Sequence, residues 1–310
     1  MKNVLIFGIN GFVGEYLASE FYQNGYEIYG SSRTGGGKHF EKCSGMFICD
    51  LLDADQVKNV ICEVNPNIIV NLAGRSSVGI SWKIPKNTLE VNVSGALNIL
   101  EAVRTCDLNP KIMMIGSSEE YASSEKPLTE ESPLSATNPY GISKLTLEGF
   151  SKMYRERYNL KVYYVRAFNH TGVGQTDSFV IPSWCKQVAE ISLSGSSGVL
   201  RVGNLDIVRD FSDVKDVVRA YRCILEKTDG SKIYNVGSGS PVSLKEILEY
   251  ICGLSEQQIE IMVDPKLIRP VENSYICCSH VALTNDTGWE PRYDIRSTIK
   301  EIFEYYLKKY

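Results

Sequence analysis

The sequence lacks the features that would assign the chain to a membrane or to a nucleic acid. Its 310 residues contain no apolar run near the ~18 residues of a membrane span, and they open on a strand pattern without a signal peptide. The 33 basic and 37 acidic residues leave a net charge of −4, which provides no basic field for a phosphate backbone. We therefore expect neither a membrane nor a nucleic acid as a partner.

The sequence also lacks any Cys-x-x-Cys pair, although it contains nine cysteines, an odd number. We interpret them as reduced thiols and expect no metal site. A chain of this length, 43% hydrophobic, can bury a large core and suggests roughly two domains. The composition predicts a soluble, cytoplasmic globular protein.

The first half of the chain alternates short apolar runs with helical patterns, which is typical of a parallel sheet with crossover helices. Strands are expected at 2–7, 27–30, 46–49, 68–72, 111–115 and 161–167, and helices at 12–24 and 87–105. After about residue 169 turn residues become frequent and the segments shorten. We predict an α/β fold: a Rossmann doubly wound parallel sheet in 1–168, with 208–236 returning to it, and a smaller α/β substrate lobe from 169–207 and 237–310.

A glycine-rich turn separates the first predicted strand from the first predicted helix. Its spacing is Gly-x-x-Gly-x-x-Gly, and such a turn lets the backbone approach a pyrophosphate at the free N–H groups of a helix N-terminus. The alternative is a close-packed turn without a ligand. We predict that the turn contacts a dinucleotide through Gly8, Asn10, Gly11, Phe12, Val13 and Gly14.

The end of the second predicted strand indicates which dinucleotide is bound. It carries Ser32 and Arg33 and no carboxylate. An acidic side chain there would bind the ribose 2′-OH of NAD, whereas a basic one would accept the 2′-phosphate of NADP. We therefore favour NADP(H) over NAD(H). Asp50 and Leu51 close the third strand and are placed to meet the adenine, although Asp is also an ordinary turn former.

A serine, a tyrosine and a lysine form the candidate catalytic group. Tyr140 and Lys144 are four residues apart, on one face of a helix that the preceding Asn-Pro pair begins. Ser117 and Ser118 end a buried strand, where open parallel sheets place their sites. Together these groups suit proton transfer to or from a carbonyl or alcohol oxygen during hydride transfer.

With these motifs the chain resembles, over its whole length, the extended short-chain dehydrogenases/reductases, which include nucleotide-sugar epimerases, dehydratases and reductases. The resemblance implies Ser117 (or Ser118) as the hydrogen-bond donor to the substrate oxygen and Tyr140 as the acid/base. It implies that Lys144 holds the nicotinamide ribose and lowers the pKa of the tyrosine. The loop with Leu72, Ala73 and Gly74 is expected along the nicotinamide, but it departs from the His-Leu-Ala-Ala of relatives.

Three later stretches, 166–175, 203–211 and 267–272, resemble the GDP-mannose branch of this group, the 4,6-dehydratases and the GDP-4-keto-6-deoxymannose reductases. Two arginines converging on a diphosphate are chemically sensible, because guanidinium groups pair with it bidentately. The substrate contacts predicted in these stretches are Asn169, Arg209, Arg269 and Glu272, and Ser76 and Ser118 are predicted as further substrate contacts.

Dehydratase and reductase differ in one requirement, because a 4,6-dehydratase needs a carboxylate to take the C5 proton. Glu119 stands where the mannose dehydratases carry theirs, so this chemistry stays open. Glu120 matches no motif, and we interpret it as a loop charge. Against the dehydratase, the chain is short and lacks the long basic insertion after Arg33.

We therefore expect an NAD(P)H-dependent 4-ketoreductase of a GDP-linked 6-deoxy-4-ketohexose, giving GDP-rhamnose or GDP-6-deoxytalose. Two alternatives remain: a GDP-mannose 4,6-dehydratase or another nucleotide-sugar 4-epimerase, and a nucleotide-sugar sensor without catalysis. Some relatives dimerise through the helices that correspond to 87–105 and 138–157, so the resemblance also implies a homodimer.

Overall fold

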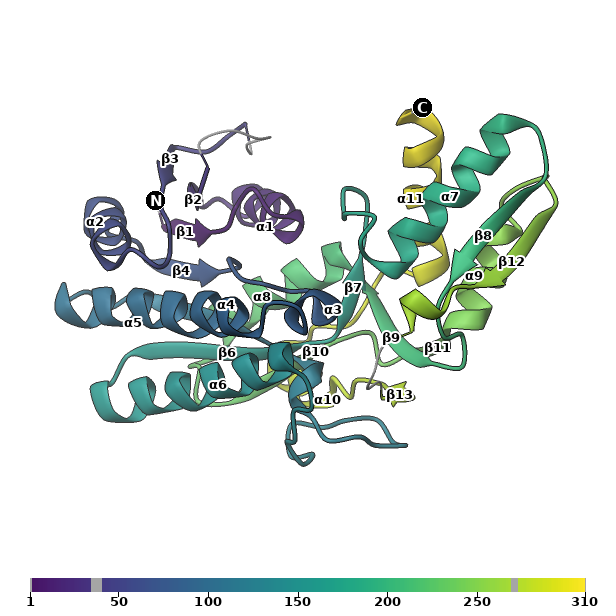
Figure 1. Ribbon diagram of the computed structural model, residues 1–310. Coiled ribbons are helices and arrows are strands. Elements are labelled where there is room, and N and C mark those ends of the chain that lie inside the picture. Colours follow the sequence, from purple (N-terminus) through teal and green to yellow (C-terminus); the bar gives the residue numbers. More distant parts are fainter. Residues whose placement is uncertain (1, 35–40, 269–272, 310) are drawn as a thin grey trace.

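The computed structural model describes residues 2–34, 41–268 and 273–309, and it has two layered parts (Figure 1). The larger part is built on seven strands in the order β10-β6-β5-β4-β1-β2-β3, each parallel to its neighbours. These strands are β1 (Asn3–Phe7), β2 (Glu27–Ser32), β3 (Gly45–Ile48), β4 (Ile68–Asn71), β5 (Lys111–Ser117), β6 (Lys161–Ala167) and β10 (Ile233–Val236). The strand order reverses between β1 and β4, as in Rossmann folds, so the predicted fold class is confirmed.

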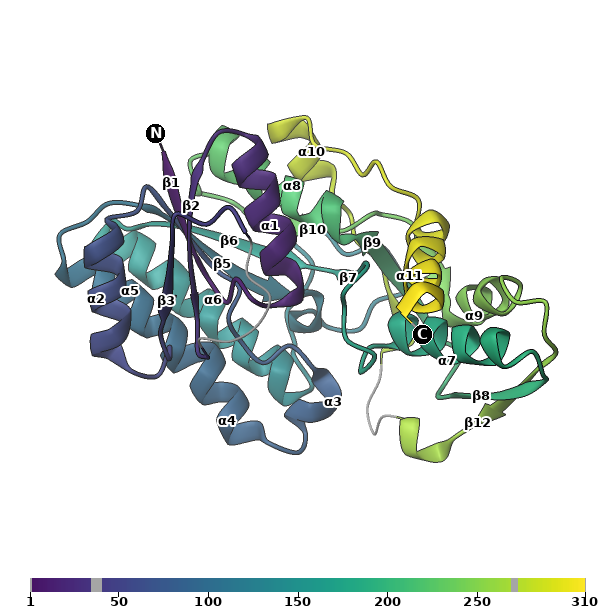
Figure 2. The ribbon, with the colours of Figure 1, turned by 90° about the horizontal axis from the view of Figure 1, so that it is seen from above.

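Helices cover both faces of this sheet (Figure 2). One face carries α1 (Phe12–Gln23), α8 (Val214–Lys227) and α10 (Val281–Thr287), and the other carries α2 (Ala54–Val64), α5 (Gly95–Thr105) and α6 (Pro139–Tyr158). Phe21 and Tyr221 belong to the apolar cluster on the first face, and Leu100 and Leu147 to the cluster on the second. Because both faces are buried, the strands are nearly continuous apolar runs.

The smaller part has its own apolar core, which includes Trp184, Leu248 and Phe303. It is formed by α7 (Val180–Ser194), α9 (Leu244–Cys252), α11 (Ile295–Lys309), the parallel pair β8 (Gly198–Val202) and β12 (Ile259–Val263), and a four-stranded sheet of β7 (Asn169–Thr171), β9 (Val208–Asp213), β11 (Pro241–Ser243) and β13 (Tyr275–Ile276). Within the stretch 208–236, β9 is part of the four-stranded sheet, whereas α8 and β10 lie with the large sheet. The division of the chain into domains stays a prediction.

The helix expected over 87–105 is broken in the structure. It consists of α4 (Pro85–Leu89), a π-helical turn at Glu90–Ser94, and α5. Asn92 in this turn accepts a hydrogen bond from the Arg75 backbone N–H (2.7 Å) and donates to the Ser143 hydroxyl (2.9 Å). The π-helical turn, which holds one residue more than an α-helical turn, thus occurs where the Asn92 side chain forms two long-range hydrogen bonds. The remaining short elements are α3 (Val78–Ser81) and the 3₁₀ turns Ser118–Glu120 and Pro265–Leu267.

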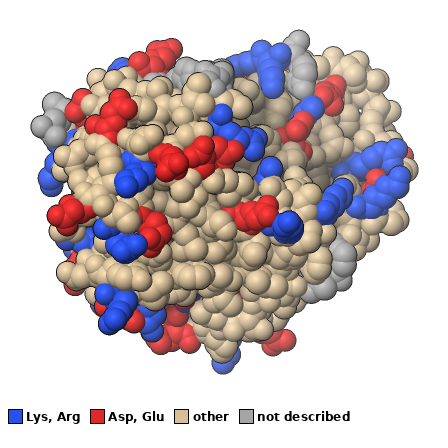
Figure 3. Space-filling model, turned by 60° about the vertical axis from the view of Figure 1, so that its left-hand side comes forward, with Lys and Arg blue, Asp and Glu red and all other residues tan. Residues whose placement is uncertain are grey.

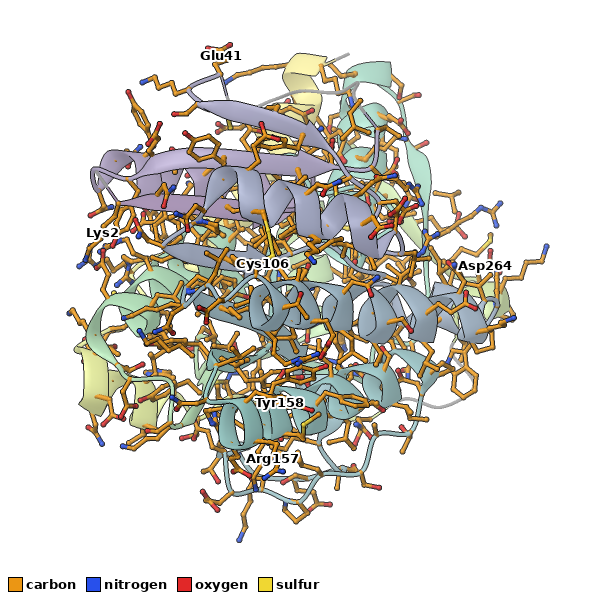
Figure 4. The ribbon with its side chains drawn as sticks, turned by 90° about the vertical axis from the view of Figure 1, so that its left-hand side faces the viewer. Lys2, Glu41, Cys106, Arg157, Tyr158 and Asp264 are labelled. Carbon is orange, nitrogen blue, oxygen red and sulfur yellow. A yellow bond between two sulfur atoms is a disulfide. The ribbon has the colours of Figure 1, made fainter. Side chains whose placement is uncertain are left out.

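One pair of cysteines contradicts the expectation of nine reduced thiols. Cys62 on α2 and Cys106 at the end of α5 form a disulfide, visible as the yellow bond in Figure 4. The two helices pack side by side on one face of the sheet, which brings together cysteines that lie 44 residues apart. The other seven cysteines are free.

The surface carries charges of both signs. On the face shown in Figure 3, acidic and basic side chains are interspersed among uncharged residues over most of the area. Within the described ranges, the structure contains no helix with the length and apolar character needed to span a bilayer.

Candidate active site

The main cavity lies at the carboxyl ends of β1, β4, β5 and β6 and has a volume of about 370 Å³. Its walls come from both layered parts of the molecule. It brings together these predicted residues: Gly8, Gly11, Phe12, Val13, Gly14, Leu72, Gly74, Ser76, Ser117, Ser118, Glu119, Tyr140, Lys144, Asn169 and Arg209. The predicted residues that do not line it are Asn10, Ser32, Arg33, Asp50, Leu51 and Ala73. Arg269 and Glu272 lie outside the described residues.

The glycine turn at one end of the cavity fits a dinucleotide pyrophosphate. Gly8 has φ +81°, a conformation that favours glycine, and a Cβ at this position would lie 2.8 Å from the Ala73 backbone nitrogen. Helix α1 begins directly after the turn, at Phe12. Its first backbone N–H groups therefore face the space that an anion would occupy.

The residues predicted for the adenosine end lie around the end of β2. The Asn10 amide donates to the Ser32 hydroxyl (3.1 Å), which donates to the Thr34 carbonyl (2.7 Å), and Arg33 is exposed. Asp50 accepts a hydrogen bond from the Leu52 backbone N–H (3.0 Å), as a turn former does. Leu51 is buried in the core of the α5 face.

The three candidate catalytic side chains converge in the cavity. Tyr140 is the second residue of α6, and Lys144 follows one turn later. The Lys144 ammonium donates to the Ile115 carbonyl (2.7 Å) and lies 5.7 Å from the centre of the Tyr140 ring. Ser117, at the end of β5, is hydrogen-bonded to Tyr140. The helix thus presents the tyrosine and the lysine to the end of the strand that carries the serine.

Protonation of the pair differs from what the resemblance implies. Burial raises the pKa of Tyr140 above its ordinary value, and the hydrogen bond with Ser117 offsets only part of that rise. Burial lowers the pKa of Lys144 to about 8. The expectation that Tyr140 has a lowered pKa is therefore wrong in this structure, because burial raises the pKa and the nearby Glu120 and Glu119 raise it further. At neutral pH Tyr140 is a protonated phenol, which can act as a general acid.

Glu119 stands at the cavity wall beside Ser117. Its carboxylate accepts a hydrogen bond from the Asn138 amide (2.8 Å), and its backbone N–H donates to the Ser117 hydroxyl (3.2 Å). Asn138 also caps α6, because its side-chain oxygen accepts from the Gly141 N–H (2.9 Å). One amide side chain thus links the carboxylate to the start of the catalytic helix.

Glu120 is not the loop charge that we expected from the sequence. It is 0% exposed, and its Oε1 accepts a hydrogen bond from the Ser117 backbone N–H (2.6 Å). Ser117 and Glu120 form a reciprocal capping box around the 3₁₀ turn. The Ser-x-x-Glu spacing of this box was the sequence signal for the hydrogen bonds between the two residues.

Sequence reasoning also missed several side chains of the cavity wall: Arg75, His170, Gln175, Phe179 and Tyr221. His170 stacks on Phe12 of the glycine turn, with ring centres 6.3 Å apart. His170 and Gln175 lie in the stretch 166–175, so the resemblance was the signal available for them. Nothing in the composition of α8 indicated that Tyr221 would line the cavity.

The two predicted substrate residues from the smaller part differ in their surroundings. Arg209 on β9 is only 6% exposed, and its guanidinium donates to the Val208 carbonyl (2.9 Å). Asn169, at the start of β7, is exposed. Among the described residues, no group of three His, Cys, Asp or Glu side chains could hold a metal ion.

A Rossmann sheet that brings a serine, a tyrosine and a lysine together at its carboxyl edge is the arrangement of an extended short-chain dehydrogenase/reductase. The family model described as GDP-mannose 4,6 dehydratase matches residues 5–302. The chain belongs to this family.

Individual relatives differ in the activity their names give. The chain is 33% identical over 256 residues to the GDP-6-deoxy-D-mannose reductase of Pseudomonas aeruginosa, covering 82% of this chain and 84% of that protein. It is 30% identical over 338 residues to the GDP-mannose 4,6 dehydratase of Homo sapiens, covering 97% and 90%. The structure of RMD from Pseudomonas aeruginosa complexed with NADPH superposes with a TM-score of 0.86 at 28% identity, covering 100% of both chains.

Proposed function

We propose that this chain is an NADPH-dependent 4-ketoreductase that converts GDP-4-keto-6-deoxymannose into a GDP-6-deoxyhexose, GDP-rhamnose or GDP-6-deoxytalose. The observation that carries the proposal is the convergence of Ser117, Tyr140 and Lys144 in one cavity. Tyr140 lies there beside Ser117 and keeps its proton at neutral pH. Reduction of a ketone needs a proton donor at the carbonyl oxygen, and a protonated phenol is one.

The roles of the side chains follow from their positions. A bound nicotinamide would supply the hydride to the C4 carbonyl carbon. Tyr140 would give its proton to the developing alkoxide, and the Ser117 hydroxyl would hold the same oxygen. Lys144, positively charged below a pH of about 8, would hold the cofactor ribose and favour the tyrosinate that remains. Arg209 would bind the diphosphate of the substrate.

The preference for NADPH rests on the end of β2. No carboxylate stands there to bind a ribose 2′-OH, and Arg33 is exposed next to Ser32. The similarity to RMD from Pseudomonas aeruginosa, whose structure is complexed with NADPH, supports the same preference. A homodimer through the helices of 87–105 and 138–157 is a further part of the proposal.

The second candidate is a GDP-mannose 4,6-dehydratase, and Glu119 favours it. Its carboxylate lies on the cavity wall near Ser117, where a base for the C5 proton would be needed. One further point supports the reductase: the Glu119 carboxylate already accepts a hydrogen bond from the Asn138 amide.

The experiment is to follow NADPH absorbance with purified protein and GDP-4-keto-6-deoxymannose made in place by a separate dehydratase. The reductase predicts NADPH loss in proportion to the ketosugar, and NMR of the product then distinguishes rhamnose from 6-deoxytalose. A flat trace with NADPH and with NADH would contradict the reductase. Conversion of GDP-mannose to the ketosugar with oxidised cofactor would instead establish the dehydratase.

A further inference from the structure

A cluster of buried charged groups lies directly beneath the catalytic edge of the sheet. Glu120 meets Arg166 and Tyr164 from β6, and Glu148 from α6. Arg166 and Glu120 are almost completely buried, with side-chain exposures of 4% and 0%, and Glu148 is 12% exposed. The cluster therefore contains two carboxyl groups and one guanidinium largely shielded from water.

Of the two carboxyl groups, Arg166 forms its hydrogen bonds with that of Glu148. Its Nε donates to Glu148 Oε2 (2.8 Å) and its Nη2 to Glu148 Oε1 (2.7 Å), a bidentate pair. Its Nη1 donates to the Tyr121 hydroxyl (2.8 Å) and to the Glu130 carbonyl (2.9 Å). Glu148 is thus the ionised member, because both of its oxygens accept from a cation.

Glu120 has an arrangement that suits a neutral acid. Its Oε1 accepts from the Ser117 backbone N–H (2.6 Å) and from the Tyr164 hydroxyl (3.1 Å). Its Oε2 is buried, accepts no hydrogen bond from the described residues, and lies 3.8 Å from Arg166 Nε. Glu148 lies within hydrogen-bonding reach of the Glu120 carboxyl group, and both of its own oxygens already accept from Arg166. An O–H on Oε2 would donate to Glu148, whereas a bare oxygen would stand unpaired beside a second anion.

We propose that Glu120 is a positioning residue: a protonated carboxyl group that holds the Ser117 backbone and sets the Ser117 hydroxyl against Tyr140. A charge on Glu120 would raise the pKa of both Lys144 and Tyr140. The Arg166–Glu148 pair therefore has a second consequence. By keeping the adjacent acid neutral, it removes one negative charge near the catalytic lysine and tyrosine, while Glu119 still acts on Tyr140.

Gly116 makes this arrangement possible. A Cβ at this position would lie 2.4 Å from Glu120 Oε1 and 2.5 Å from the Tyr164 hydroxyl oxygen. Any larger residue would therefore push the carboxyl group away from the Ser117 N–H. Gly116 and Glu120 act as one unit at the end of β5.

The first test does not depend on turnover. Infrared difference spectra at neutral pH between the wild type and Glu120→Gln should contain the carbonyl stretch of a protonated carboxylic acid, which is well separated from carboxylate bands. The matched control is Glu156→Gln, on the same helix as Glu148 but with a 60% exposed side chain, and it should leave the band in place. Glu148→Gln should remove the band, because Arg166, no longer paired with an anion, then stabilises the ionised form of Glu120, which releases its proton to the solvent. A wild-type spectrum without the acid band, or a band that survives Glu120→Gln, would overturn the proposal.

The second test is kinetic and rests on the proposed reductase activity. Glu120→Gln should keep kcat within about twofold, because its amide can accept from Ser117 and donate to Glu148 as the acid does. Glu120→Leu, of similar size, should lower kcat roughly tenfold with KM unchanged, since Ser117 loses its anchor. Glu148→Gln, which keeps the side-chain shape, should move the fall of the rate at high pH upward by roughly one unit.

The outcomes separate the two proposals. An inactive wild type would refute the reductase, while the infrared band would still decide the state of Glu120. If Glu120→Leu does not fold, the pH shift of Glu148→Gln carries the kinetic test. A Gln variant as impaired as the Leu variant, or an unshifted profile in Glu148→Gln, would overturn the positioning role.

Discussion

The two ends of the cavity are built in different ways. At the proposed catalytic end the polar groups are held by hydrogen bonds within the larger part of the molecule: Lys144 to Ile115, Ser117 to Glu120, and Glu119 to Asn138. The substrate end is formed by segments distant in sequence, and it combines the buried Arg209 with the exposed Asn169.

Because of this difference, the type of chemistry and the choice of substrate depend on different residues. The catalytic end is preorganised, so the type of chemistry follows from few residues on β5 and α6. The proposed substrate end depends on how two layered parts meet, so on this proposal the identity of the substrate would follow from residues spread along the chain. Variants at the two ends should therefore change different kinetic constants.

Replacing the general acid should have the largest effect. Tyr140→Phe should lower kcat by about 10²–10⁴-fold, because it removes the proton donor and leaves the ring in place. Initial rates of NADPH oxidation measure this loss, and a direct NADPH titration should remain close to wild type. Tyr158→Phe, at the far end of the same helix, is the matched control (Figure 4). Substantial activity in Tyr140→Phe would assign the proton to another group.

A change at the substrate end should act on KM. Arg209→Met should raise KM for the GDP-sugar about 10- to 100-fold with little change in kcat, because it removes charged hydrogen bonds to a diphosphate. Arg201→Met, on β8 and exposed, is the control and should behave as wild type. A loss confined to kcat would place Arg209 at the reacting centre. It would contradict the expectation that the two ends of the cavity affect different kinetic constants.

The pH dependence of kcat/KM should reflect the titration of groups at the catalytic end of the cavity alone. The pKa of Lys144, lowered by burial to about 8, means that the lysine loses its charge as the pH rises through that value. We expect kcat/KM to fall about tenfold per unit above it, because only the protonated form holds the cofactor and supports the tyrosinate. A profile that stays level until the ordinary range of a lysine would show that burial does not control this group.

The smallest effect is expected at the exposed adenosine end. Arg33→Ser should reduce the preference for NADPH over NADH about fivefold, in line with the modest contribution of an exposed charge pair. The ratio of kcat/KM for the two cofactors measures this preference. An unchanged ratio would mean that Arg33 does not meet a 2′-phosphate.

The sequence was sufficient to predict the parts of the molecule that depend on local pattern. The strand at 161–167 has the predicted bounds, and the helix predicted at 12–24 ends one residue earlier in the structure. The fold class and the convergence of Ser117, Tyr140 and Lys144 also followed from patterns in the chain. These features need only periodicity, turn residues and the rule that parallel strands end at one edge.

The rest depends on contacts between distant segments. The break in 87–105 accompanies the bonds of Asn92 to Arg75 and Ser143, which periodicity does not reveal. The pairing of Cys62 with Cys106 follows from how α2 packs on α5. The pKa of Tyr140 depends on how deeply it is buried, and a sequence does not contain that depth.

The π-helical turn gives this helix one place that can absorb a change in length. A π turn holds one residue more than an α turn, and the extra residue is taken up as a local bulge. Deleting one residue within Glu90–Ser94 should therefore leave a continuous α-helix, with the inward side chains of α5, such as Ile99 and Val103, still facing the core. A deletion inside α5 itself would instead turn the side chains on one side of it by about 100° relative to the other. Homologous chains that keep this packing should thus differ in length at 90–94 rather than within α5.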